Sequence, residues 1–232
     1  MRVQPTAVST SADQLESRHS LCATSILCTR PRNLRRLGRL HEDSRLQSVS
    51  SCFAVIRQLR SIRRSVSPAV LQSLVASLVL SRLDYGKATL YGLPGNQIDR
   101  MQSVMNAAAR QVFSARKYEH VTPLLRDLHW LRVSDQIEFK LSVLVFRCLD
   151  GIAPAYLSDE LHRVPDSGTR RRLRSTSSPA LVVPPMRRTT IGDRSFPVAG
   201  ARVWNALPSF VTNSTISFKH HFKTYLFARS RS

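Results

Sequence analysis

The sequence predicts a mainly α protein: an irregular helical bundle with a long basic loop and a disordered N-terminal leader. Apolar residues recur at three- and four-residue steps through most of the chain, a spacing typical of helices that bury one face. Ser67-Pro68 and Thr122-Pro123 have the form of a helix N-cap followed by proline at the first helical position. No stretch of any length alternates apolar and polar residues as a half-buried strand does.

Composition divides the 232 residues into four regions. Residues 1–45 are polar, with serine and threonine clusters and an arginine-rich piece, and they show no lasting period, so we expect a disordered leader. Residues 46–162 carry the helical pattern. Residues 163–190 form a basic loop rich in Arg, Pro and Ser, and residues 191–232 return to a helical pattern.

The first predicted helix starts at residue 46 and carries two parallel stripes. Its apolar stripe consists of Leu46, Val49, Phe53, Ile56, Leu59 and Ile62. Arg57, Arg60 and Arg64 recur at similar steps and form a basic row beside the buried face. This row either contacts phosphates or is an ordinary solvated helix face.

The next two helices are predicted from caps and stripes. We expect a central helix after Ser67, because its apolar stripe is broad: Val70, Leu71, Leu74, Val75, Leu78 and Val79. The residues Tyr91–Gly95 break the chain. Asn96 is then expected to cap a helix with Asp99 in its favourable first turn.

The later helices are predicted in the same way. One is capped by Ser134 or Asp135, and it is expected to be buried because it is apolar nearly all round as far as Gly151, which ends it as a C′ residue. Short helices are expected at 154–161 and 196–207, and a final amphipathic helix starts near Ser217. Two of the four cysteines, Cys52 and Cys148, lie on apolar faces and are expected in the core.

The formal net charge is +20 and the isoelectric point is about 11.3. A charge of that sign attracts polyanions, so RNA or DNA is the expected partner. Arginine predominates, and its planar guanidinium suits phosphate oxygens and base faces. Besides the basic row, the candidate backbone contacts are Arg170, Arg171, Arg172, Arg174, Arg187 and Arg188 in the basic loop, which is alternatively an unstructured charged linker.

Five sequence blocks carry a family resemblance. They are Ser81–Arg110, Thr122–Leu131, Gly151–Leu157, Gly192–Phe196 and Arg202–Pro208. In order and spacing they resemble the region downstream of the polymerase core in reverse transcriptases of LINE-type (jockey-like) non-LTR retrotransposons. The resemblance covers roughly residues 46–228. It implies thumb-like helices that hold nucleic acid, followed by later blocks whose role in the family we cannot assign.

The same resemblance implies that the catalytic palm is missing. Polymerase chemistry uses clustered carboxylates that hold two metal ions, and no Tyr/Phe-x-Asp-Asp occurs in this chain. We therefore expect a non-catalytic fragment without a cofactor. The alternatives are a helical protein-interaction piece, using an apolar face left by the absent palm, a non-functional product of a truncated copy, or an enzyme whose catalytic half is encoded upstream.

Other site chemistry finds little support. No nucleotide-binding, hydrolase or zincin motif occurs, and His129 near Asp127 and Ser134 is expected to pack rather than act in a triad. Asp135 and Glu138 fall one turn apart on a helix and are expected to be a solvated acidic pair, with Glu138 supporting Arg or Lys neighbours. The spacing of His19, Cys22, Cys28 and His41 matches no standard metal site, and His220 with His221 are expected at the surface.

The sequence also bears on location. No continuous apolar segment of signal-peptide type starts the chain, and the apolar run Ala69–Leu83 is too short for a bilayer. The scattered cysteines fit a reducing compartment. We expect an intracellular protein, nuclear or cytoplasmic, that is neither secreted nor in the membrane.

Gly86 is expected to weaken the end of its helix by about 1 kcal/mol relative to alanine.

Overall fold

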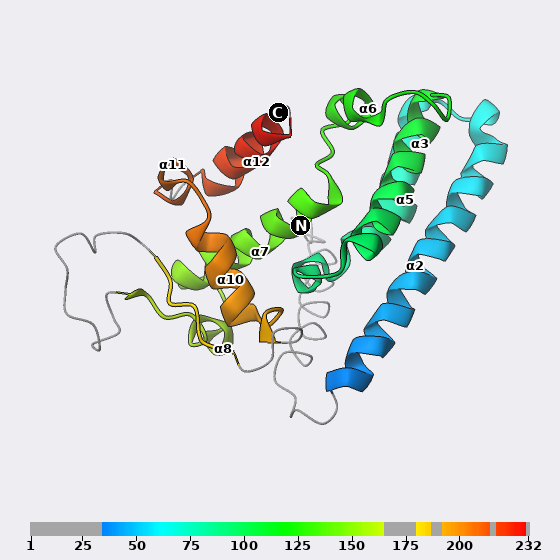
Figure 1. Ribbon diagram of the computed structural model, residues 1–232. Helices are drawn as coiled ribbons and strands as arrows, with labels where there is room; N and C mark the ends of the chain where they lie inside the picture. The colour runs from blue at the N-terminus through cyan, green and yellow to red at the C-terminus, as the bar shows by residue number, and fades with distance from the viewer. Residues whose placement is uncertain (1–33, 165–179, 187–191, 214–216, 231–232) are drawn as a thin grey trace, which may run out of the picture. The chain divides into compact units, whose positions relative to one another are not determined.

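A computed structural model of the protein describes residues 34–164, 180–186, 192–213 and 217–230, with side chains described from residue 47 (Figure 1). Helices make up 71% of the residues it describes, which confirms the predicted mainly α fold. These residues hold no strand, only an isolated antiparallel bridge between Arg163 and Leu181. Contacts divide the chain into Met1–His41 and Glu42–Ser232, and the packing below is that of the second unit.

The first helix is longer than its apolar stripe predicted. α2 runs over Leu34–Ile62, so residues 34–45 are helical where we expected a leader without regular structure. Once a helix is nucleated, each added residue costs little, so a strong pattern after residue 46 extends a helix into weaker sequence. Within the stripe, Ile56 and Leu59 are buried together with Cys52, while Ile62 at the end of the helix is 42% exposed.

The earlier helices build a first hydrophobic core. They are α2, α3 (Pro68–Val75), the π-helical η2 (Ala76–Leu80), α4 (Ser81–Asp84), η3 (Lys87–Leu90), α5 (Gly95–Phe113) and α6 (Val121–Asp127), and Val133 and Ile137 also belong to this core. α3 packs on α5, and α5 on α6, as Figure 1 shows. The α3 stripe is narrower than predicted: Leu71, Val75 and Val79 are buried, whereas Val70 is 49% and Leu78 40% exposed. Neighbouring helices cover only one side of α3, so this helix is not buried all round as a central helix would be.

A second core is built by the later helices. They are α7 (Val133–Leu149), α8 (Ala155–Ser158), α10 (Phe196–Asn205), α11 (Ser209–Thr212) and α12 (Phe218–Arg229). α7 serves both cores, since Ile137 belongs to the first and Leu141 and Val145 to the second. This confirms the burial predicted from its apolar surface. At the centre of the second core, the ring of Phe218 stacks on that of Phe146 with centroids 4.6 Å apart.

Helix termini test the predicted caps. Ser67 is the N-cap of α3, where its Oγ accepts a hydrogen bond from the Val70 N–H at 3.4 Å, as predicted. The other capping predictions are wrong. Pro94, His120 and Arg132 precede α5, α6 and α7, and none of them makes a side-chain capping bond. Candidate caps stand close together in these stretches, and tertiary packing decides which backbone turns first.

The residues expected at those caps therefore lie inside the helices. Asn96 and Thr122 are within α5 and α6, and Asp99 falls beyond the first turn of α5. Ser134 and Asp135 lie within α7, where Asp135 is the acid of the first turn. A carboxylate there is favourable next to the unpaired N–H groups of the helix start.

Gly86 has a different role from the one we predicted. Its φ is +65°, in the left-handed region, directly before η3 (Lys87–Leu90). Glycine adopts this conformation without the steric cost that a Cβ introduces. Gly86 therefore permits the turn after α4 and does not weaken a helix. Gly151, at φ +72°, follows α7 as the predicted C′ residue.

The two described cysteines are core residues, as predicted. Cys52 and Cys148 are buried free thiols. Burial raises the pKa of the Cys148 thiol to about 11 and also raises that of Cys52. A thiol that stays protonated is a poor nucleophile and metal ligand, so neither cysteine offers reactive chemistry.

The contact between α7 and α10 requires a residue without a side chain at Gly200. A Cβ added there would lie 2.9 Å from Cγ2 of Val145, a branched side chain that is itself fully buried. We expect Gly200→Ala to lower the free energy of unfolding by about 1 kcal/mol, because overpacking outweighs the better helix propensity of alanine. Chemical denaturation measures this change.

The matched control is Gly95→Ala, at a helix position where an added Cβ meets nothing within 4 Å. This variant should be neutral or slightly stabilised, since alanine reduces the entropy of the unfolded chain. Equal effects of the two substitutions would contradict the close contact at Gly200.

Candidate nucleic-acid interface

The predicted basic row lies on the surface at the C-terminal end of α2. Arg57 and Arg60 belong to α2, and Arg64 to η1 (Arg63–Ser65), which continues it. All three side chains are exposed, and none forms an ion pair with a described residue. Cys52, Ile56 and Leu59 fix the rotation of the helix by burying the neighbouring face. The row is therefore open to a ligand in solution.

Few acidic residues lie near the row in the sequence. Residues 47–83 contain five arginines and no aspartate or glutamate. The first acid after them, Asp84, is already engaged: its Oδ2 lies 2.8 Å from Nζ of Lys140 and its Oδ1 3.5 Å from Nζ of Lys87. A row of guanidinium groups with no ion pair to a described residue produces a positive potential that attracts phosphates.

Lys87 shows how Asp84 is held in place. Its side chain is only 3% exposed, and its ammonium group also donates a hydrogen bond to Oε1 of Gln136 on α7. A buried ammonium ion needs such partners because burial otherwise disfavours its charge. Asp84 therefore serves as a structural counter-ion for Lys87.

The remaining predicted contacts lie outside the described residues. These are Arg170, Arg171, Arg172, Arg174, Arg187 and Arg188 in the basic loop. The side chains of His19, Cys22, Cys28 and His41 also lie outside the described part of the chain. Residues 180–186 of the same region are described, and there the Val182 N–H donates to the His162 carbonyl at 2.8 Å.

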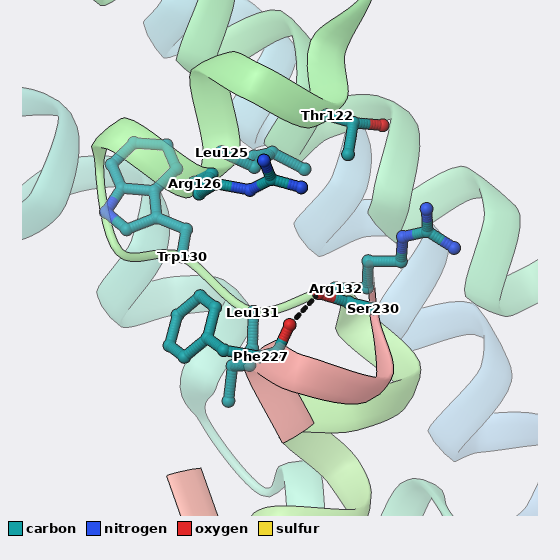
Figure 2. A pocket seen from close by; sticks show the side chains of 8 residues that line it. All are labelled: Thr122, Leu125, Arg126, Trp130, Leu131, Arg132, Phe227 and Ser230. Atoms are coloured by element: carbon teal, nitrogen blue, oxygen red, sulfur yellow. Dashed lines mark hydrogen bonds between the residues drawn. The ribbon is translucent and has the colours of Figure 1, made fainter. Parts of the chain in front are cut away.

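The structure shows a second basic cluster, which the sequence analysis did not predict. Figure 2 shows Arg126 of α6 and Arg132, which precedes α7, on two sides of a small pocket that Trp130 and Phe227 also line. Both arginines are exposed. The cavity volume is about 20 Å³, room for about one water, so it does not enclose a small-molecule substrate. The signal in the sequence was the tryptophan between two arginines.

The acidic pair of α7 is ion-paired and only partly exposed, contrary to the predicted solvated pair. Arg229 at the end of α12 donates to Oδ1 of Asp135 at 2.9 Å and to Oε2 of Glu138 at 2.6 Å. Asp135 is 8% exposed. The hydrogen bond to Glu138 and that to Asp135 raise the pKa of the Arg229 guanidinium, although partial burial opposes the shift. The pair therefore binds the guanidinium of Arg229, a partner far away in the sequence and not a neighbour on the same helix.

The histidines whose side chains the structure describes are all exposed. His129 has a φ of +54° and is exposed, with its ring edge-on to that of Phe227 at 6.3 Å. This contact fits the expected packing role. His220 and His221 are exposed, as predicted. The described residues contain no group of three or more His, Cys, Asp or Glu side chains that could hold a metal ion.

Comparisons with known proteins identify no relative: no protein-family model, no curated protein and no solved structure matches this chain. Within the described part of the chain, no helix has the length and apolar character needed to cross a membrane. Function is therefore inferred from the geometry and charge of this molecule and from the motifs of its sequence.

Proposed function

We propose that the chain is a non-catalytic, C-terminal thumb and post-palm region of a LINE-type reverse transcriptase, and that it binds the backbone of RNA or DNA electrostatically. The observation that carries the binding proposal is the exposed row Arg57, Arg60 and Arg64, which forms no ion pair with a side chain that the structure describes. The motif resemblance supports the family. An intracellular location, nuclear or cytoplasmic, fits such a ligand.

The mechanism is neutralisation of phosphates with release of counterions. Three guanidinium groups on one helical edge can each meet a phosphate, and none of these contacts reads a base. Binding is therefore tolerant of sequence and falls steeply with salt.

Nucleic-acid retention over a series of salt concentrations tests this proposal. The purified chain should retain RNA or DNA of any sequence at low salt, and the logarithm of the binding constant should fall linearly with the logarithm of salt concentration. No retention at low salt, or an affinity unaffected by salt, would reject it. Incorporation of deoxynucleotides by the purified chain would separately reject the non-catalytic assignment.

One observation favours a second candidate, a helical protein-interaction module. On the outer side of α3 and η2, Val70 and Leu78 are 49% and 40% exposed, with half-buried Leu74 between them. Apolar side chains that gather on one helix face are typical of contacts between proteins. Sedimentation with and without nucleic acid separates the two: an interaction module self-associates or stays unchanged when RNA is added, and a nucleic-acid binder shifts with the RNA.

A further inference from the structure

The turn that joins α5 to α6 has an aromatic residue at its tip. α5 ends at Ser114, whose left-handed φ of +62° turns the chain away from the helix axis. The Glu119 N–H then donates to the Arg116 carbonyl at 3.2 Å, which closes a turn with Lys117 and Tyr118 at its centre. Both central residues are exposed.

Side-chain bonds hold this turn in shape. The carboxylate of Glu119 accepts a hydrogen bond from the Arg116 N–H at 2.8 Å. From α5, the guanidinium of Arg110 donates to the Glu119 carbonyl at 3.3 Å. The turn is thus closed by its own backbone and tied to the preceding helix. A ligand that binds it meets a preformed surface, so little entropy is lost by ordering the loop.

Tyr118 is 83% exposed, more than any other large hydrophobic residue in the part of the chain that the structure describes. Its neighbours Arg116, Lys117 and His120 are exposed as well. The only acid between Ala115 and His120 is Glu119, whose carboxylate already binds the backbone of Arg116. The tip therefore combines an open aromatic face with a net positive charge, since Arg116 and Lys117 outnumber Glu119.

We propose that residues 116–120 form a binding site for single-stranded nucleic acid, in which an unpaired base stacks on the ring of Tyr118 and the side chains of Arg116 and Lys117 contact the adjacent phosphates. An aromatic face among cations is the arrangement that binds single strands without sequence preference. In a duplex the base faces are covered by neighbouring base pairs, so the ring gains little there. The inference rests on the proposed function and adds to it a preference for single strands.

The test compares Tyr118→Ala and Tyr118→Phe in the full chain. The probes are a single-stranded oligothymidylate of about 20 nucleotides, longer than the segment that a stacking site of this kind covers, and a duplex of the same length. Tyr118→Ala should bind the single strand at least about fivefold more weakly than wild type, because it removes the ring on which a base stacks. Its affinity for the duplex should stay within about twofold of wild type, because the bases of a duplex do not stack on the ring. Tyr118→Phe should keep wild-type affinity, since it keeps the ring.

The matched control is Tyr156→Ala, because Tyr156 on α8 is another exposed tyrosine, at 45%, far from this turn in the sequence. It should leave both affinities unchanged. The inference is overturned if Tyr118→Ala binds the single strand like wild type, if it loses both probes equally, or if Tyr118→Phe is as weak as Tyr118→Ala. A Tyr118-dependent affinity for phosphatidylserine vesicles, with no such dependence for the single strand, also overturns it in favour of a membrane surface.

The same two probes distinguish a failure of the proposed arginine row from a failure of the proposed site at Tyr118. If replacing Arg57, Arg60 and Arg64 changes neither probe while Tyr118→Ala still weakens the single strand, the row is rejected and the turn stands. If the row variant weakens both probes and Tyr118→Ala changes neither, the turn is rejected and the row stands. If the wild-type chain retains neither probe at low salt, both are rejected.

Discussion

Phe222→Ala should lower the free energy of unfolding by about 3–5 kcal/mol, as expected when a large aromatic side chain is removed from a closed core. Phe222 is fully buried on α12, and its ring stacks on Phe139 of α7 with centroids 5.7 Å apart. It also meets the ring of Phe218 at 5.7 Å. The loss combines the transfer free energy of the ring with the cavity that it leaves.

Chemical denaturation followed by helical circular dichroism measures this loss. Phe210→Ala is the matched control, because Phe210 is 62% exposed and its ring meets that of Tyr225 edge-on at 5.9 Å. That variant should cost less than about 1 kcal/mol. Similar losses in the two variants would contradict the second core as described.

Arg229→Ala should lower the free energy of unfolding by about 2 kcal/mol, because it leaves Asp135 and Glu138 without their cation. The side chains of these acids are 11% and 23% exposed, so their charges are only partly hydrated. Breaking a fully buried pair costs about 3–5 kcal/mol, and the 40% exposure of Arg229 reduces the expected loss. The interaction joins the last helix to the start of α7.

Arg202→Ala provides a control with the same ion-pair distance but a single acid and less burial. Arg202 lies 2.9 Å from Asp193, the distance between Arg229 and Asp135, but the Arg202 and Asp193 side chains are 46% and 35% exposed. Its loss should be less than about 1 kcal/mol. Replacing Asp135 and Glu138 by Asn and Gln should restore part of the stability of Arg229→Ala. If Arg229→Ala costs no more than Arg202→Ala, the ion pairs of Arg229 do not stabilise the fold as we describe.

The sequence predicted the parts of the fold that depend on local pattern. The three- and four-residue spacing of residues such as Val75 and Leu141 predicted helices and their buried faces, and Ser67-Pro68 predicted the start of α3. The sequence did not predict the tertiary contacts. Arg229 and Asp135 are 94 residues apart, so nothing in their local sequence indicates that they meet.

The candidate site was predictable only where it depends on local helical spacing and not where it depends on contacts between distant residues. The row of Arg57, Arg60 and Arg64 follows from helical spacing, and the structure describes all three as exposed. The turn at Tyr118 depends on a left-handed residue and on hydrogen bonds from Arg110 and Glu119, which no periodicity reveals. The arginines of the basic loop lie outside the described residues, and their role stays a prediction.

The salt dependence of duplex binding, measured for a variant in which Arg57, Arg60 and Arg64 are replaced by glutamine, tests the central claim most directly. Arg100, Arg147 and Lys219 are exposed cations elsewhere in the chain, and replacing them by glutamine removes the same charge as a control. We predict that the slope of log binding constant against log salt is shallower by about 2.7 in the row variant, about 0.9 for each phosphate that is no longer neutralised. The control variant should keep the wild-type slope. Identical slopes in the row and control variants would show that net charge alone governs binding and would contradict a defined interface on α2.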